Sequence, residues 1–228
     1  GVYYLVKRRD DSIHKDNKIK LQMSELRMQA LRAQMNPHFI FNSLNSIQNY
    51  ILSNNTIDAA AYLSKFAKLM RRILDQSKHN FLPLGEVMET LKMYVEIEAF
   101  RFNNEFSYTF NVEDNDDLLD ARVPPMLLQP FVENAILHGL MPKAGEKKLM
   151  INCSLINADA EIIIDDNGIG RTQLNAKAGH TSQGQKLTAG MLESLQQIQN
   201  IKASIEITDK TGNGISAGTT VKFILPLR

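Results

Sequence analysis

Apolar and polar positions lie on opposite faces of residues 38–51 when the segment is placed on a helix with about 100° per residue. The apolar face consists of Ile40, Leu44, Ile47 and Ile51. The polar face consists of His38, Asn42, Asn45 and Asn49. The pattern therefore predicts an amphipathic helix on which the imidazole of His38 faces solvent and has no core to join.

Further helices are predicted on either side of this segment. Residues 16–35 have the charged, partly heptad-like pattern of a short coiled coil, which is equally compatible with packing on a neighbouring helix. Asn36 and Pro37 then restart or kink the helix, because proline lacks a backbone donor and suits a first helical turn. After the polar run 53–56, Thr56 is the expected N-cap of the next helix. The apolar stripe of that helix consists of Leu63, Phe66, Met70 and Ile73.

The two helices that follow Asn36 should form a hairpin with too little core to be stable alone. A second copy is the simplest cover for its apolar faces, which predicts a homodimer built around a four-helix bundle. Composition changes near residues 80–83, so we expect a domain boundary there.

Beyond this boundary the chain mixes helices and strands. The expected helices are 86–101, 126–140 and one that begins at Gly190. The expected strands are 106–110, 149–156, 161–165, 203–208 and 219–225, with loops at 113–120 and 171–188. Helices mixed with antiparallel strands predict an α/β sandwich with helices on one face of the sheet. The fold class of the whole chain is then α+β, with a membrane-proximal segment at 1–15, a coiled coil and helical hairpin at 16–80, and the sandwich domain at 81–228.

Composition is that of an ordinary soluble globular protein, with 43% hydrophobic and 22% charged residues. The net charge of +1 gives no field that would favour nucleic acid as a partner. Cys153 is the only cysteine, which excludes an internal disulfide and a multi-cysteine zinc site. Residues 1–6 are apolar and precede a basic run, as at the cytoplasmic end of a membrane helix. We therefore expect a cytoplasmic region joined to a membrane through a segment further towards the N-terminus.

Candidate chemistry lies at the end of the expected strand 161–165. Asp166 follows this strand, and Gly168 and Gly170 form part of the turn after it. A carboxylate at the rim of a sheet can accept a hydrogen bond from an exocyclic amine such as that of adenine, and glycines let a ligand approach the backbone. Such a sequence is also common in a simple turn, so this segment alone does not identify a site.

Two further segments carry candidate site residues. Asn134 and His138 lie four residues apart on the expected helix 126–140, so they line one edge of it. The amide oxygen of Asn134 suits Mg²⁺, which takes one or two protein oxygens and completes its shell with phosphates and water. Alone, a structural asparagine explains this position equally well. Gly218 and Thr219 lie at the start of the last expected strand, and on their own they do not indicate a site.

Together, and in this order, the three segments resemble the nucleotide-binding boxes of the histidine-kinase type ATPase superfamily. Asn134 matches the N box, 166–170 the first glycine box, and Gly218 with Thr219 the last. The first half of the chain carries further motifs: LRAQMNPHFIFNSLN at 31–45, YLSKF at 62–66, YVEIE at 94–98 followed by Arg101 and Phe102, and PPMLLQPFVENA at 124–135. These resemble the LytS/YehU-type sensor histidine kinases from about Leu26 to the C-terminus.

The resemblance implies an ATP-dependent protein histidine kinase of a two-component system. His38 would take the γ-phosphoryl group of ATP and pass it to an aspartate of a response regulator. Adenine would lie on Asp166, and the triphosphate with Mg²⁺ near Asn134, under a lid within 171–188. The resemblance also assigns Gly168, Gly170, Gly190, Gly218 and Thr219 to the nucleotide site.

Three positions depart from related patterns. Phe39 stands where many histidine kinases outside this family have an acid, and Asn42, one turn on, is placed to orient the imidazole or a hydrolytic water. Gly190 lies in the sequence TAGM rather than in a Gly-x-Gly-Leu pattern. Leu137 replaces a common basic residue, which leaves phosphate neutralisation to His138 or to lysines of the lid.

Two other functions remain open at this point: an ATPase of the same superfamily without a phosphohistidine, and a catalytically silent dimeric scaffold.

Overall fold

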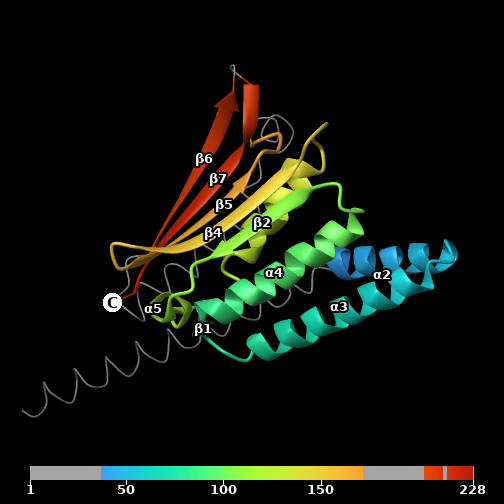
Figure 1. Ribbon diagram of the computed structural model, residues 1–228, viewed down its shortest axis with the longest axis horizontal. Helices are drawn as coiled ribbons and strands as arrows, with labels where there is room; N and C mark the ends of the chain where they lie inside the picture. Colours follow the sequence, from blue (N-terminus) through green and yellow to red (C-terminus); the bar gives the residue numbers. More distant parts are fainter. Residues whose placement is uncertain (1–36, 172–202, 213–214, 228) are drawn as a thin grey trace, which may run out of the picture.

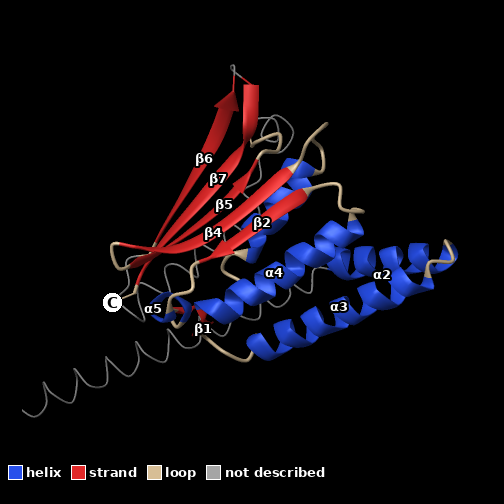
Figure 2. Ribbon diagram, in the orientation of Figure 1, coloured by secondary structure: helices blue, strands red, loops and turns tan. Residues whose placement is uncertain are grey.

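A computed structural model describes residues 37–171, 203–212 and 215–227 (Figure 1). The described chain forms a helical hairpin, a long helix beside it, and a five-stranded sheet on the other side of that helix (Figure 2). This arrangement confirms the expected α+β class. The expected helices at 16–35 and from Gly190, and the polar stretch after Arg171, lie outside the described residues. Among the helices that are described, none has the length and apolar character needed to cross a membrane.

The hairpin consists of α2 (Pro37–Leu52) and α3 (Thr56–Gln76). Asn55 rather than Thr56 is the N-cap of α3, because its side-chain oxygen accepts a hydrogen bond from the backbone N–H of Asp58 at 3.3 Å. Thr56 already belongs to the helix, so the expected cap was wrong by one residue. Asp58 lies in the first turn of α3, where its negative charge interacts favourably with the helix dipole.

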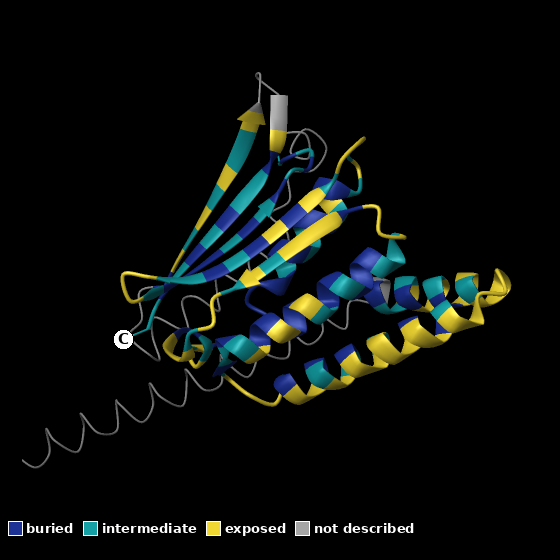
Figure 3. Cartoon of the chain, in the orientation of Figure 1, coloured by how far each residue is buried: buried dark blue, intermediate teal, exposed yellow. Residues whose placement is uncertain are grey.

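The hairpin buries a face next to the one that periodicity predicted. Phe39, Ser43 and Ile47 are buried on α2. Leu44 and Ile51 of the predicted stripe are 48% and 54% exposed. The reason is aromatic packing, since the ring of Phe39 lies 5.5 Å from that of Tyr94 on the neighbouring helix. On α3 the buried apolar residues are Ala59, Tyr62, Leu69 and Ile73, and much of the outer surface of the hairpin is exposed (Figure 3).

Helix α4 (Leu84–Arg101) separates the hairpin from the sheet. It matches the expected helix 86–101 and starts directly after Pro83, which suits a helix beginning. Its buried residues include Leu84, Val87, Met88, Leu91, Tyr94, Val95, Ile97 and Glu98. An ion pair between Arg72 and Glu89 joins α3 to α4 at the surface. The core of the protein is therefore continuous from the hairpin through α4 to the sheet.

The strands of the sheet occur in the order β2 (Ser107–Val112), β4 (Lys148–Ile156), β5 (Asp159–Asp166), β7 (Ile215–Pro226) and β6 (Ser204–Gly212). Each includes most of an expected strand. The pairs β4/β5, β5/β7 and β6/β7 are antiparallel, whereas β2 pairs with β4 in parallel, which the sequence did not indicate. Residues Ala160, Ile162 and Ile164 alternate along β5 and are at most 1% exposed, so one face of this central strand is fully covered.

Two connections differ from the sequence prediction. The acidic run 113–120 contains the short helix α5 (Asp116–Leu119), capped by Asn115 and anchored by the fully buried Leu118. Its lone apolar anchor explains why composition alone indicated a loop. The chain also forms a two-residue antiparallel pair between β1 (Leu82–Pro83) and β3 (Arg122–Val123). This pair joins the segment before α4 to the segment after α5.

Candidate nucleotide-binding and phosphoacceptor regions

Asp166 is the last residue of β5 and lies on the same face as the buried Ile162 and Ile164, because side chains alternate along a strand. The residue is only 3% exposed, although its side chain ends in a carboxylate. The Oδ1 atom accepts a hydrogen bond from the backbone N–H of Gly168 at 2.7 Å, which closes the turn after the strand. The fold thus holds a carboxylate in a fixed orientation at the rim of the sheet.

Burial raises the pKa of the Asp166 carboxyl from 3.8 to about 6. The backbone N–H of Gly168 and the nearby Lys210 act in the opposite direction, since both favour the charged form. The neighbouring Asp165 is on the other side of the strand and is paired, because its carboxylate accepts bonds from Lys210 at 2.7 Å and from Thr220. Asp166 is therefore mostly an anionic acceptor at neutral pH.

Three glycines let the backbone pack around Asp166. A Cβ on Gly168 would lie 2.3 Å from the carbonyl carbon of Gly139, and one on Gly218 would lie 2.0 Å from the carbonyl oxygen of Asp166. A Cβ on Gly139 would lie 2.9 Å from Asp166 Oδ1. Gly218 also has a φ of +116°, which side-chain-bearing residues rarely adopt. The predicted Gly168, Gly218 and Asp166 are thus brought together, with Thr219 opposite Asp166 in the β5/β7 register.

The predicted helix 126–140 begins later than expected and is not α-helical throughout. Met126 has a φ of +70°, α6 spans Gln129–Asn134, and the following six residues Ala135–Leu140 form the π-helix η1. A π-helix has i to i+5 hydrogen bonds in place of i to i+4 bonds, and the arrangement of Asn134 and His138 along one edge stays a prediction. The π-turn instead brings the carbonyl oxygen of Gly139 to the N–H of Ile169 at 3.0 Å. Such turns occur often at functional sites.

The two predicted polar residues of this segment differ in exposure. Asn134, the last residue of α6, is half-buried, while His138 in η1 is exposed. Both can therefore meet a ligand from solvent. The amide oxygen of Asn134 is a hard donor of the kind that Mg²⁺ accepts, and one such ligand is sufficient when phosphates supply others. The residue types present thus fit a magnesium nucleotide.

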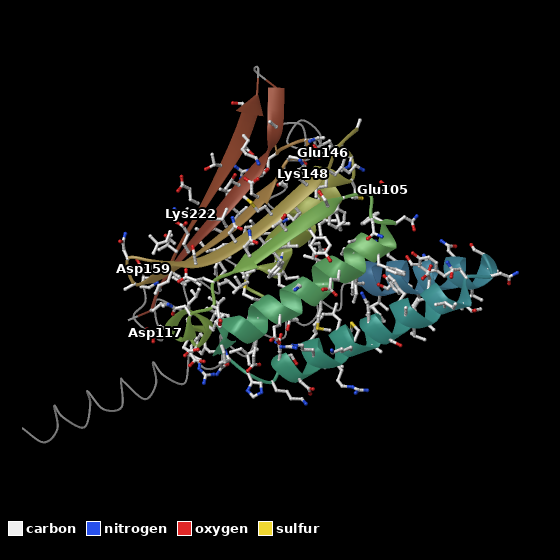
Figure 4. The ribbon with its side chains drawn as sticks, in the orientation of Figure 1. Glu105, Asp117, Glu146, Lys148, Asp159 and Lys222 are labelled. Carbon is white, nitrogen blue, oxygen red and sulfur yellow. The ribbon has the colours of Figure 1, made fainter. Side chains whose placement is uncertain are left out.

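Sequence reasoning missed the clamp that holds the first glycine box. Asn167 accepts a hydrogen bond from the N–H of Lys148 at 2.7 Å and donates one to the carbonyl oxygen of Glu146 at 3.1 Å. The ammonium group of Lys143 donates to the carbonyl oxygen of Asn167. The Glu146 and Lys148 side chains form an ion pair of 2.8 Å at the same end of the sheet (Figure 4). The segment after η1 is therefore hydrogen-bonded to the turn that follows Asp166.

Gly139 was also absent from the predicted site, although the sequence contains a signal for it. A glycine inside an apolar helical pattern weakens the helix and usually has a packing reason. Here the reason is the 2.9 Å approach to Asp166. The clamp residues carry no comparable signal, because lysine and asparagine in a loop are ordinary.

The phosphoacceptor candidate lies in the hairpin. His38 belongs to the first turn of α2, but its side chain is outside the described part of the structure. The next residue, Phe39, packs between Phe66 of α3 and Tyr94 of α4, with ring centroids 5.8 and 5.5 Å away. Asn42 is half-buried, and its carbonyl oxygen accepts a bond from Ser46. Gly170 is buried, and Gly190 lies outside the described residues.

The hairpin and α4 lie beside a sheet whose central strand β5 ends in the buried carboxylate of Asp166 and a turn that contains glycines. This arrangement is consistent with the class of protein histidine kinases. A family model described as histidine kinase matches residues 26–106. The chain is 32% identical over 221 residues to the sensor protein LytS of Oceanobacillus iheyensis, covering 92% of this chain and 36% of that protein. It is 28% identical over 213 residues to the sensor histidine kinase/phosphatase LytS of Staphylococcus aureus, covering 90% and 35%.

The chain belongs to the LytS-type sensor histidine kinases. It spans about a third of the length of the LytS proteins that it matches, with 36% and 35% covered. Among solved structures, the histidine kinase domain of the blue-light activated kinase of Erythrobacter litoralis EL346 aligns with a TM-score of 0.49 at 15% identity, over 92% of this chain and 96% of that one.

Proposed function

We propose that this chain is the catalytic region of an ATP-dependent sensor histidine kinase that phosphorylates itself on His38. The observation that carries the proposal is the buried carboxylate of Asp166, which is fixed by Gly168 and packed against Gly139, while Gly218 packs against the Asp166 backbone. This carboxylate is an acceptor suited to an exocyclic amine, and the chain around it belongs to a histidine kinase family. In this proposal residues 16–80 are the phosphoacceptor and dimerisation region, and residues 81–228 bind ATP.

Each predicted site residue then has a role. Asp166 accepts a hydrogen bond from the adenine amine, while Gly168, Gly170, Gly190, Gly218 and Thr219 allow or make close backbone approach to the nucleotide. Asn134 holds Mg²⁺, which supplies positive charge beside the phosphates, and His138 adds a donor there. The exposure of His138 and the partial exposure of Asn134 support these roles.

His38 is the proposed nucleophile. A free imidazole titrates near pH ~6.5, and its neutral form has one ring nitrogen with a free lone pair. That nitrogen bonds to the γ-phosphorus while the bond to the bridging oxygen breaks and ADP leaves. The phosphoryl group then passes to a carboxylate of a response regulator, and the histidine is regenerated.

A homodimer is proposed through the outer face of the hairpin. Leu44, Ile51 and Leu63 are 48%, 54% and 49% exposed, and they would be covered by the same face of a second copy. Membrane attachment through a segment outside this chain and a cytoplasmic location of the kinase region remain predictions.

The test is incubation of the full chain with γ-labelled ATP and Mg²⁺. The kinase requires an acid-labile, alkali-stable label on the wild type that is absent from His38→Gln. Turnover of ATP without any label would instead establish an ATPase, and neither label nor turnover would establish a silent scaffold. Asn49→Ala, on the exposed polar side of α2, is a matched control that should label normally.

A phosphatase function is proposed for Asn42, since the similar LytS of Staphylococcus aureus is named a kinase/phosphatase. Asn42 lies one turn after His38 on α2, where its amide can orient a hydrolytic water. Asn42→Ala should slow dephosphorylation of the regulator and leave the label on His38 in place. An unchanged rate of dephosphorylation would refute this role.

A further inference from the structure

The backbone of Gly139 in η1 does not by itself require a glycine. Its φ lies outside the left-handed region, in contrast to the φ of Gly170 and of Gly218. Alanine is intrinsically favoured over glycine inside a helix, because glycine loses more conformational freedom on folding. The reason for a glycine at this position must therefore lie in the atoms that surround it.

The nearest atoms outside its own helix belong to the carboxylate of Asp166. A Cβ on Gly139 would lie 2.9 Å from Oδ1, 3.3 Å from Cγ and 3.7 Å from Oδ2 of that side chain. A Cβ on Gly168, by contrast, would meet backbone atoms of Gly139 at 2.3 to 2.6 Å. Gly168 is thus required by the packing of two backbones, whereas Gly139 is required by the orientation of a single carboxylate.

The two oxygens of this carboxylate are not equivalent. Oδ1 accepts the hydrogen bond from the N–H of Gly168 at 2.7 Å, and it is also the oxygen nearer to Gly139. The backbone N–H of Thr219 on β7 further favours the charged form. Because each carboxylate oxygen has two acceptor sites, Oδ2 keeps capacity for a donor on a ligand. The packing of Gly139 therefore holds Oδ1 inward and leaves Oδ2 as the oxygen that a ligand can address.

We propose that Gly139 is a specificity-determining positioning residue, because the space it leaves keeps Oδ1 of Asp166 on Gly168 and presents Oδ2 alone to the base of a nucleotide. The inference rests on the proposed nucleotide site. Adenine has an amine at C6, which needs one acceptor, whereas guanine has an oxygen there, which an anion repels. Guanine can bind a carboxylate through its N1–H and its 2-amine together, but this arrangement needs both oxygens. With Oδ1 held inward, the site selects an adenine nucleotide over a guanine nucleotide.

The contact itself is tested by a double-mutant cycle in the full chain, with Gly139→Ala, Asp166→Ala and both changes together. Gly139→Ala alone should lower the melting temperature, because its Cβ displaces the carboxylate from Gly168. Asp166→Ala removes all the atoms that this Cβ would meet, so Gly139→Ala should be neutral or stabilising in that background. Equal losses in both backgrounds would overturn the inference. If Gly139→Ala does not fold, recovery of folding in the double variant supports the inference, and an unfolded double variant beside a folded Asp166→Ala refutes it.

Specificity is tested by calorimetric titration of ADP and of GDP into the wild type and Gly139→Ala. The wild type should bind ADP at least about tenfold more tightly than GDP, since the two bases differ by a hydrogen bond to a charged group. Gly139→Ala should reduce this preference about tenfold, because the displaced carboxylate no longer holds one oxygen inward. A loss of folded protein lowers the binding of both nucleotides alike, so the ratio of the two Kd values reports positioning rather than stability.

The matched control is Gly85→Ala, in the first turn of α4. Gly85 has no left-handed φ, and the nearest atom to a Cβ there belongs to Leu119 at 3.5 Å, an ordinary contact. This variant should keep the melting temperature and the preference for ADP of the wild type. An unchanged preference in folded Gly139→Ala, or a wild type that binds ADP and GDP equally, would overturn the inference. A wild type that binds neither nucleotide would instead refute the proposed nucleotide site, which keeps the two failures distinct.

Discussion

Nucleotide affinity should depend on the charge of Asp166, and the pH at which it changes follows from the structure. Burial raises the pKa of this carboxyl from 3.8 to about 6. If the adenine amine donates to Asp166, only the anionic form binds well, so acidification should weaken binding. Replacing the residue, as Asp166→Asn, removes the titration and keeps the shape of the side chain.

The magnitude follows from the fraction ionised. With a pKa of about 6, about a tenth of the carboxyl is anionic at pH ~5 and nearly all at pH ~7.5. The Kd for ADP of the wild type should therefore rise about tenfold over this range, or about 1.4 kcal/mol. Stability should change in the opposite direction. A raised pKa means that the folded form holds its proton more tightly, so this group stabilises the fold below pH ~4 and loses that effect as pH rises through about 6.

The assay is calorimetric titration of ADP into the wild type and Asp166→Asn at several pH values between 5 and 8. ADP itself titrates in this range, but the ratio of the two Kd values at each pH removes that contribution. The ratio should favour the wild type at pH ~7.5 and shrink about tenfold at pH ~5. A ratio that stays constant across the range would refute the assignment of Asp166 as the charged acceptor for adenine.

Two further variants test the packing of the site and the dimer. Gly218→Ala should cost about 2 kcal/mol or more in unfolding free energy and weaken ADP binding, because a Cβ would lie 2.0 Å from the carbonyl oxygen of Asp166. Gly145→Ala has a similar φ of +82° with no atom within 4 Å, so it should cost only about 1 kcal/mol, and equal losses would exclude a contact effect. Leu44→Glu should convert the proposed dimer to monomer in sedimentation experiments, while Asn45→Glu on the exposed polar side should not; a dimeric Leu44→Glu would exclude this face as the interface.

Periodicity identified the described elements of the fold more reliably than their faces. The helix 86–101 and the strands near 149–156 and 161–165 agree with α4, β4 and β5, because a long run at one period leaves little choice. On α2 the buried face includes Phe39 and Ser43 instead of Leu44. Periodicity sums apolarity along one helix, whereas the buried face depends on which partner ring, here Tyr94, lies opposite.

The sequence likewise indicated the site residues but not the contacts that hold them in place. The order of Asn134, Asp166 and Gly218 along the chain indicated a nucleotide site, and the structure brings Asp166, Gly168 and Gly218 together. The hydrogen bonds by which Asn167 holds the turn after Asp166 became visible only in the tertiary structure. Its bonds run to Glu146 and Lys148, about twenty residues away, and no local pattern records such a pairing.

The sequence by itself predicted a solvent-facing histidine at position 38, and it determined that the chain has a carboxylate at a strand end and the motif order of a histidine kinase. These properties depend on residue type and spacing, which are local. Only the tertiary structure decided that Asp166 is buried with a raised pKa and that α6 continues as the π-helix η1 up to Leu140. Burial and electrostatic environment depend on what the rest of the chain places around a residue, so they exist only once the chain has folded.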